Sequence, residues 1–335
     1  MKDFAYARAG SVDDVVAALS DPGTAVLAGG TELLNWLRLG IAEPDRVVDI
    51  ADLGLDDIGG DGGSALVIGA RATLNAVGGS PLVAEHAGAL SSACLQAASA
   101  QIRHRATLGG NVLQRPRCPY FRTEAPVPWP CNKREPGSGC ASLAGRHERQ
   151  AVFGGTDGCV AVQPSDPAVA LAALDATADV VGPAGWRSIP MREFHLSQAE
   201  AAATGEPMRE HRLDPGELIL SYRIPVRGDR SAYVKVRERA SYEYAIVSAA
   251  GTVRLGDDGR IAAARIALGS VAQRPWRLDD AEAALVGLPA TREALLPVVD
   301  AALPDAAPLA QNAFKVPMAR NAAVRALLLA AGGAA

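Results

Sequence analysis

The sequence has few aromatic side chains, no long apolar run and no long run of charge of one sign. Aromatic residues make up 4% of the 335 residues and apolar residues 49%, so the packing must rest on Ala, Val, Leu and Ile. This apolar content excludes a disordered chain. The net charge of −4, from 33 basic and 37 acidic residues, gives no nucleic-acid footprint. We therefore expect a globular protein with no nucleic-acid partner.

Membrane and export signals are also missing from the sequence. No stretch approaches the roughly 18 uninterrupted apolar residues of a membrane helix. The N-terminal residues 1–8 contain no apolar run of signal-peptide length. We expect no membrane span and no export signal in this chain. Its length suggests two domains, since single cores rarely grow beyond roughly 250–300 residues.

Cysteine is scarce but clustered. The odd total of five in a chain of this size argues against a disulfide framework. Four of them lie in one Pro- and Gly-rich segment, with spacing C-x12-C-x8-C-x18-C: Cys118, Cys131, Cys140 and Cys159. The paired C-x2-C knuckles of zinc ribbons are absent, which favours a four-iron cluster over zinc or four unrelated buried thiols. Cys94 lies on an apolar helix pattern and is left out of the site, as is the lone His147.

The glycine fingerprint of a doubly wound dinucleotide fold, G-x-G-x-x-G, is absent. In its place, Ala28-Gly-Gly-Thr-Glu32 connects a short apolar run to the helical pattern that begins at Leu33. Two glycines before a helix let backbone N–H groups approach a phosphate closely. The loop is therefore either a pyrophosphate cradle or an ordinary Gly-rich connection.

A second glycine pair occurs in Thr107-Leu-Gly-Gly-Asn111, and Pro164-Ser-Asp166 follows the cysteines. Together with the first loop, these segments suggest a long ligand with two halves, and a dinucleotide fits that description. Asp166 begins a predicted helix, so capping of that helix is the alternative to nucleotide contact.

Periodicity predicts strands and helices along the whole chain. The first part reads as helix, strand and helix over 11–40, strands at 46–50 and 65–70, a helix over 81–100, then a strand at 160–162, a helix at 168–174, and strands at 178–181 and 218–224. The last hundred residues read as strands at 233–237, 242–250 and 261–269, followed by helices at 278–286, 291–302 and 318–331. Strands followed by helices predict a small α+β domain.

Several stretches resemble the FAD-binding subunit of molybdenum hydroxylases, the family of xanthine dehydrogenase, aldehyde oxidoreductase and carbon monoxide dehydrogenase. They are Leu27-Ala-Gly-Gly-Thr-Glu-Leu33, the segment 102–111, the segment 164–175, and Tyr233-Val-Lys-Val-Arg with the segment 244–250. The resemblance covers essentially the whole chain in order. The segments Arg117–Arg122 and Pro130–Cys140 look like the bacterial periplasmic-type aldehyde oxidoreductase branch, whose FAD subunit carries an extra four-iron four-sulfur cluster.

The resemblance implies an α+β fold: a vanillyl-alcohol-oxidase-like (PCMH-like) FAD-binding domain over residues 1–226, with a cysteine-rich insertion at 115–160, then a C-terminal domain of the CO dehydrogenase flavoprotein type over 227–335. It implies FAD and a 4Fe-4S cluster as cofactors, with the four clustered cysteines as the metal ligands. The implied FAD-binding residues are Leu27, Ala28, Gly29, Gly30, Thr31, Glu32, Leu33, Thr107, Gly109, Gly110, Asn111, Ser165, Asp166 and Lys235. Without the resemblance, Lys235 reads as an ordinary solvated strand charge.

The implied function is that of an oxidoreductase subunit that relays electrons. Substrate is oxidised on a large subunit with a molybdenum cofactor, and electrons pass through the 2Fe-2S clusters of a small subunit to FAD on this chain. We expect no catalytic side chain, since the flavin carries the redox chemistry. The subunit of an aldehyde oxidoreductase is favoured over that of a xanthine dehydrogenase or hydroxybenzoyl-CoA reductase-like complex. A zinc-stapled nucleotide-binding module and a self-sufficient flavin oxidase are alternatives.

Two features of the implied complex stay open at the level of sequence. No nicotinamide-binding signature identifies the terminal electron acceptor. The chain is expected in the cytoplasm, or in the periplasm by export together with a partner subunit that carries a signal.

Overall fold

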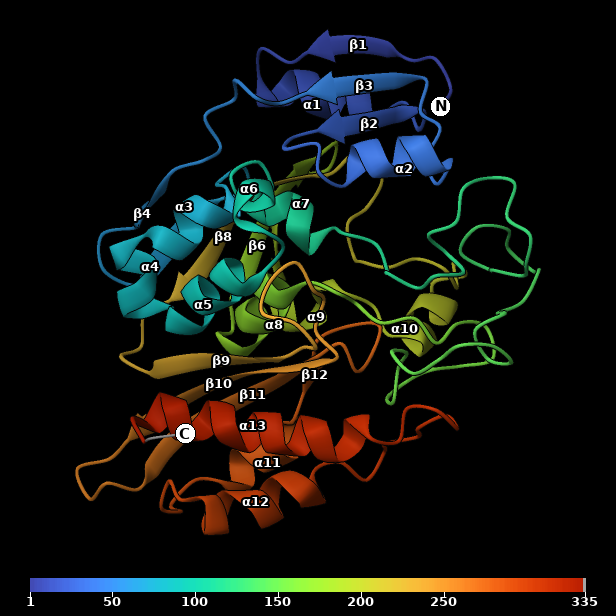
Figure 1. Cartoon of the computed structure of the whole chain (residues 1–335). Helices are drawn as coiled ribbons and strands as arrows, with labels where there is room; N and C mark the ends of the chain where they lie inside the picture. Colours follow the sequence, from blue (N-terminus) through green and yellow to red (C-terminus); the bar gives the residue numbers. More distant parts are fainter. Residues whose placement is uncertain (334–335) are drawn as a thin grey trace.

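The computed structural model describes residues 1–333 as three β-sheets with helices between and around them (Figure 1). The N-terminal sheet is parallel and has the order β1-β3-β2, formed by Ala5–Arg8, Arg46–Asp49 and Thr24–Leu27. Helix α1 (Val12–Leu19) follows β1 and is capped at its N-terminus, because the Ser11 hydroxyl accepts from the Asp14 N–H and the Asp14 carboxylate accepts from the Gly10 N–H. Helix α2 (Leu33–Leu39) follows β2 directly.

The central sheet is antiparallel and has the order β4-β5-β8-β6-β7. Its strands are Ile58–Gly60, Ala65–Gly69, Leu218–Pro225, Thr177–Gly182 and Gly185–Pro190. The largest core includes Ile68 and Tyr222 from this sheet together with Leu90 and Leu171 from helices, all of them fully buried.

The third sheet is also antiparallel, with the order β12-β11-β10-β9, formed by Trp276–Arg277, Ile261–Gly269, Val247–Leu255 and Arg230–Val236. The long helix α13 (Lys315–Ala331) packs against this sheet. Close packing is possible because a Cβ on Gly251 of β10 would lie only 3.1 Å from the backbone of Ala326.

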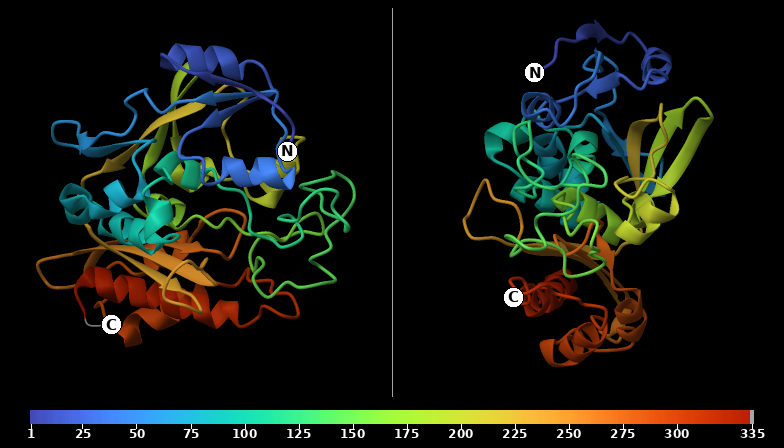
Figure 2. Two further views of the ribbon diagram at one scale, coloured as in Figure 1. Left: turned by 45° about the horizontal axis from the view of Figure 1, so that its top comes forward. Right: turned by 90° about the vertical axis from the view of Figure 1, so that its right-hand side faces the viewer.

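Helix α8 (Asp166–Ala173) lies between the second and third sheets and is buried along its whole length. It packs against β10 and β11, while its residues also belong to the core of the central sheet. The N-terminus of helix α8 therefore lies against the third sheet, so that Asp166, its first residue, lies beside Lys235 of β9. The side view in Figure 2 shows the three sheets stacked from the N-terminus to the C-terminus.

The remaining helices are short. They are α3 (Leu74–Gly79), α4 (Pro81–His86), α5 (Gly88–Gln96), α6 (Ala100–Arg103), α7 (Leu108–Val112), α9 (Met191–Phe194), α10 (Gln198–Ala203), α11 (Asp279–Ala284) and α12 (Arg292–Ala301). No helix within residues 1–333 is both long enough and apolar enough to cross a membrane.

Residues 113–165, here called the cysteine segment, contain neither a helix nor a strand, and they extend to one side of the molecule (Figure 1). Asn312 and Lys315, at the start of α13, hold residues 149–150 of the segment in place. The buried ammonium of Lys315 donates to the carbonyl oxygens of Arg149, Gln150 and Ser270 at 3.1, 2.7 and 2.6 Å. The Asn312 amide donates to the Gln150 carbonyl at 3.2 Å. Polar side chains thus anchor the segment together with Val152 and Phe153, which are buried in the core of the third sheet.

The predicted α+β class is confirmed, and most predicted elements are present within a few residues. Three predictions are wrong. The helix over 81–100 is broken into α4 and α5, since Ala87 between them leaves the helical region with φ −144° and ψ 50°. The strand at 242–250 begins only at Val247, because Tyr242 has a φ of +53° and lies in a loop. The strand at 160–162 is absent, since Val160 and Val162 find no neighbouring strand in the cysteine segment.

Candidate functional site

Two cavities meet where the N-terminal sheet, the central sheet and the third sheet come together. One has a volume of about 600 Å³ and the other about 500 Å³. Thr31 and Glu32 of the first glycine loop and Gly110 of the second loop line both cavities. The glycine loops therefore stand between two adjacent cavities, an arrangement that suits a long ligand with two halves.

The first glycine loop requires both of its glycines. A Cβ on Gly29 would lie 1.8 Å from the carbonyl oxygen of Arg105, so only glycine lets the two backbones approach. Gly30 has a φ of +76°, which favours glycine, and a Cβ there would meet only the ordinary contacts of Leu27 and Leu34. None of the described residues accepts a hydrogen bond from the backbone N–H groups of residues 29–32. These adjacent free donors, at the junction of the cavities, form a concavity suited to a phosphate anion.

The second glycine loop is largely engaged by the protein itself. The Thr107 hydroxyl caps α7 by accepting from the Gly110 N–H at 3.2 Å. The Gly109 N–H donates to the Ala70 carbonyl at 2.8 Å, and a Cβ on Gly109 would lie 3.1 Å from that oxygen. Gly109 therefore serves close packing, while Gly110 and Asn111 are the residues that face the smaller cavity.

Asp166 and Lys235 form a buried ion pair in the wall of the smaller cavity, with Nζ 2.7 Å from Oδ2. The side chain of Lys235 is only 1% exposed, so its interpretation as a solvated strand charge is wrong. The Tyr233 hydroxyl donates to the other carboxylate oxygen. Burial and the neighbouring carboxylate raise the pKa of Tyr233 well above its ordinary value, so its hydroxyl stays a donor. Ser165, rather than Asp166, caps α8.

Glu32 connects the first glycine loop to the cysteine segment. Its carboxylate accepts from the Trp36 indole N–H at 2.8 Å and from the Arg117 guanidinium at 2.6 Å, and it forms a further ion pair with Arg122. The backbone N–H of Arg115 also donates to it, at 3.2 Å. The Glu32 carboxylate is thus engaged by Arg115, Arg117 and Arg122, which flank Cys118. It holds these residues in place beside the first glycine loop.

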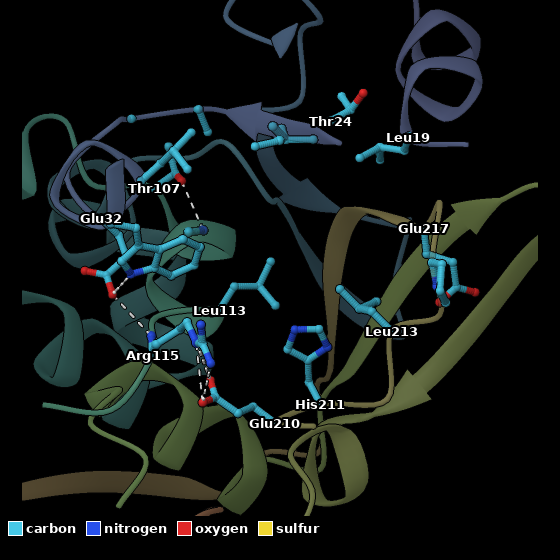
Figure 3. A pocket seen from close by; sticks show the side chains of 18 of the residues that line it. Leu19, Thr24, Glu32, Thr107, Leu113, Arg115, Glu210, His211, Leu213 and Glu217 are labelled. Carbon is cyan, nitrogen blue, oxygen red and sulfur yellow. Dashed lines mark hydrogen bonds and ion pairs between the residues drawn. The ribbon is translucent and has the colours of Figure 1, made fainter. Parts of the chain in front are cut away.

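The segment that precedes β8 forms an unpredicted wall of the larger cavity. Figure 3 shows Arg115, Glu210, His211 and Leu213 gathered there. The His211 Nδ1 is buried and has no hydrogen-bond partner among the described residues. Burial lowers the pKa of His211, so a neutral ring faces the cavity. Sequence reasoning missed these residues because they stand in a charged turn without periodicity, and only the central place of β8 in its sheet brings the turn to the cavity.

Most of the predicted FAD-binding residues line one cavity or both. The larger cavity is lined by Ala28, Gly29, Gly30, Thr31, Glu32, Leu33, Thr107 and Gly110, and the smaller one by Thr31, Glu32, Gly110, Asn111, Asp166 and Lys235. Three predicted residues lie behind the walls: Leu27, Gly109 and Ser165. The Ser165 hydroxyl nevertheless donates to the Asn111 side chain at 2.7 Å and so fixes a residue that lines the smaller cavity.

The four clustered cysteines converge on one small cavity of about 20 Å³, which all of them line. All are free thiols, and an isolated antiparallel bridge pairs Cys131 with Cys140. Within the described part of the chain, no group of three or more Cys, His, Asp or Glu side chains is arranged to hold a single metal ion. Four thiols around a common centre are the donor set of an iron–sulfur cluster and also of a structural zinc site. The cavity has room for about one water molecule, so the thiols would move apart around a cluster.

The buried thiols are held in their protonated form. Burial raises the pKa of Cys118, against hydrogen bonds from the backbone of residues 120 and 121 and from the Gln150 side chain. Burial also raises the pKa of Cys159 to about 11, and the Ala161 N–H donates to its sulfur at 3.5 Å. A metal would bind the thiolates, so cluster assembly must release these protons.

Comparisons with protein families match almost the entire chain. Residues 2–227 match the family described as FAD binding domain in molybdopterin dehydrogenase. Residues 231–330 match the CO dehydrogenase flavoprotein C-terminal domain.

Individual proteins give the same picture. The aldehyde oxidoreductase FAD-binding subunit PaoB of Escherichia coli K12 is 39% identical over 324 residues, which cover 96% of each chain. The carbon monoxide dehydrogenase medium chain of Afipia carboxidovorans is 27% identical over 87% of this chain and 83% of its own. Among solved structures, a carbon monoxide dehydrogenase from Hydrogenophaga pseudoflava superimposes with a TM-score of 0.74, at 27% identity, over 99% of this chain and 98% of its own.

Proposed function

The chain belongs to the family of FAD-binding subunits of molybdenum hydroxylases, and we propose that it serves in a complex that oxidises aldehydes. The predicted family and the predicted FAD cofactor are confirmed by the family matches. The aldehyde assignment is supported by the likeness to an aldehyde oxidoreductase subunit, which is 39% identical, against 27% for the carbon monoxide dehydrogenase chain. We further propose that residues 1–226 and 227–335 are two domains.

FAD would span the two cavities. The observation that carries this placement is their junction at Thr31, Glu32 and Gly110, beside the free N–H donors of the first glycine loop. Those donors fit the pyrophosphate. The larger cavity, with Leu213 and the neutral imidazole of His211, fits the adenosine half. The smaller cavity would then receive the isoalloxazine ring.

The polar groups of the smaller cavity fit a flavin. Asn111 and Gln114 offer amide groups to a ring edge that both donates and accepts hydrogen bonds. Lys235 is held by Asp166, so its ammonium keeps a fixed position in the cavity wall. When bound, FAD supplies the redox chemistry of this chain. The side chains bind the flavin, orient it and fix the charge around it.

We propose that the four cysteines of the cysteine segment, Cys118, Cys131, Cys140 and Cys159, hold a four-iron four-sulfur cluster. Their convergence on one cavity as free thiols supports this assignment. Their spacing lacks the paired C-x2-C knuckles of zinc ribbons, which supports a cluster over zinc.

The substrate would bind elsewhere in the complex. We propose two partners, a large subunit with the molybdenum cofactor and a small subunit with 2Fe-2S clusters, so that electrons reach this chain from the small subunit. The names of relatives such as the carbon monoxide dehydrogenase medium chain support such an assembly. This chain would receive electrons and pass them to an acceptor.

The test is to express the chain alone and together with candidate large and small subunits, then to assay aromatic aldehydes with an artificial electron acceptor. We expect aldehyde-dependent flavin reduction only in the assembled complex. Aldehyde-dependent reduction of the flavin in the isolated chain would instead indicate a self-sufficient oxidase. An assembled complex that oxidises purines and leaves aldehydes unchanged would contradict the aldehyde assignment.

A further inference from the structure

Between the cysteine cavity and the larger cavity lies a chain of three charged side chains. Lys133 lines the cysteine cavity, and its Nζ lies 2.9 Å from a carboxylate oxygen of Glu210. Glu210 lines the larger cavity, as does Arg115, whose guanidinium lies 3.4 Å from the same carboxylate. Glu210 thus has one cationic neighbour in the wall of each cavity.

The Lys133 ammonium is shielded from water and only partly paired. Its side chain is 1% exposed, and the Glu210 side chain is 15% exposed. None of the described residues accepts a well-aligned hydrogen bond from Nζ, although an ammonium has three N–H groups to donate. The wall of the cavity that the four thiols share therefore holds a buried ammonium whose charged partner is the Glu210 carboxylate.

The Glu210 carboxylate responds to this charge. Burial would raise the pKa of Glu210, but Lys133 and Arg115 together hold it below its ordinary value, so the carboxylate is ionised. The neighbouring Arg134 differs from Lys133, since its guanidinium is taken up by the carbonyl groups of Phe121 and Leu39, among others.

We propose that Lys133 and Glu210 set the reduction potential of the cluster, with Lys133 raising it and Glu210 limiting the rise. This inference rests on the proposed cluster. Reduction adds one negative charge to a cluster, and a buried cation nearby favours the reduced form. The carboxylate offsets part of that charge and, through Arg115, ties the position of the lysine to the wall of the nucleotide cavity. Both residues act on the potential through their charges and from fixed positions.

The test compares Lys133→Met, Glu210→Gln and the double variant in the full chain, co-expressed with its partner subunits and purified anaerobically. The midpoint potential of the four-iron centre is measured by redox titration with EPR detection, alongside iron, sulfide and FAD content. We expect a lower potential for Lys133→Met, a higher one for Glu210→Gln, and for the double variant a value between those of Lys133→Met and wild type. Lys133→Arg keeps the charge and should keep the potential near that of wild type.

Arg146→Met is the matched control, because it removes one positive charge from the same segment at a side chain that is 80% exposed. Screening by water should leave its potential unchanged. Shifts of the same sign in Lys133→Met and Glu210→Gln, or no shift in either, would overturn the proposal. If Lys133→Met loses its iron, the Glu210→Gln variant decides, and an unshifted potential in that variant is enough to overturn the proposal. Wild-type protein without iron would refute the proposed cluster itself, and this inference with it.

Discussion

Gly30 combines a backbone requirement with a position at the junction of the two cavities. Its φ of +76° costs a residue with a Cβ roughly 1–2 kcal/mol, and a branched side chain would also reach into the space proposed for the pyrophosphate. We predict that Gly30→Val raises the Kd for FAD at least about tenfold, equivalent to roughly 1.4 kcal/mol of binding free energy, and so lowers FAD occupancy. The ratio of flavin absorbance to protein in the purified variant measures this.

The control variant Gly54→Val separates the backbone cost of a positive φ from the loss of a contact with FAD. Gly54 has a φ of +64°, and no neighbouring atom lies within 4 Å of the position that a Cβ would occupy, so it carries a similar backbone cost away from the cavities. We expect Gly54→Val to lose stability and to keep its flavin. Full flavin occupancy in folded Gly30→Val protein would show that the first glycine loop does not bind the pyrophosphate.

His195 supports the second glycine loop and should make the protein sensitive to acid. Its Nε2 lies 2.9 Å from the Val112 carbonyl at the end of α7, which requires Nε2–H, and its Nδ1 is buried with no partner among residues 1–333. Burial lowers the pKa of His195 to about 4. The unfolded chain therefore binds a proton near pH 6.5 that the folded chain does not bind until about pH 4, so stability falls as the pH drops through this window.

We predict that His195→Gln, which keeps an N–H donor but does not titrate, removes part of this acid sensitivity. Between about pH 7 and about pH 4.5, wild type should lose about 2–3 kcal/mol more unfolding free energy than the variant. Urea unfolding at both pH values measures the difference. Equal losses in the two proteins would mean that His195 is able to take up a proton in the folded state.

At the scale of elements, the cysteine segment has no helix or strand, and around residues 118–140 its contacts with the rest of the chain are mainly those of Arg117, Arg122 and Arg134. Metal binding and folding are coupled where a segment lacks a core of its own. We predict that Cys131→Ser loses most of the iron and makes residues 113–165 sensitive to limited proteolysis. Iron and acid-labile sulfide analysis, with mass spectrometry of the fragments, tests both effects.

Cys94→Ala is the control for this prediction. Cys94 is fully buried in the core of the central sheet, outside the cysteine cavity, and burial strongly raises its pKa. The variant should retain its iron. A content of one zinc per chain, with neither iron nor sulfide after anaerobic purification, would show that the four cysteines hold zinc and not a cluster.

Some parts of the site can be predicted from residues that are neighbours in the sequence, and others cannot. Strand β2, the turn at Gly29 and Gly30, and helix α2 could be predicted because a turn with a positive φ and a helix start depend on neighbouring residues. Glu210 could not be predicted, since its role depends on Lys133 and Arg115, which are distant in sequence. Lys235 looked like an exposed charge on an alternating strand because its partner, Asp166, begins helix α8 and is distant in sequence.

At the scale of the whole molecule, Asp175 joins the segment after α8 to the third sheet. Its carboxylate forms ion pairs with Arg227 at 2.7 Å, Arg265 at 2.6 Å and Arg277 at 2.8 Å. Burial would raise the pKa of Asp175, but the arginines hold it below its ordinary value. Because the smaller cavity has walls from both α8 and β9, this junction fixes the distance between the two sides of the proposed flavin site.

We predict that Asp175→Asn lowers the unfolding free energy by about 1–2 kcal/mol and speeds FAD release several-fold. Asn tolerates the φ of +50° at this position, so the change removes the negative charge without straining the backbone. The loss stays below the roughly 3–5 kcal/mol of an uncompensated buried charge, since Arg265 and Arg277 keep Asp229 and Glu282 as partners. Asp300→Asn breaks a pair in which Asp300 is 60% exposed, and it should change neither quantity measurably. Denaturant unfolding and the recovery of flavin fluorescence after dilution measure the two effects. A destabilised Asp175→Asn protein that releases FAD at the wild-type rate would show that the junction does not shape the flavin site.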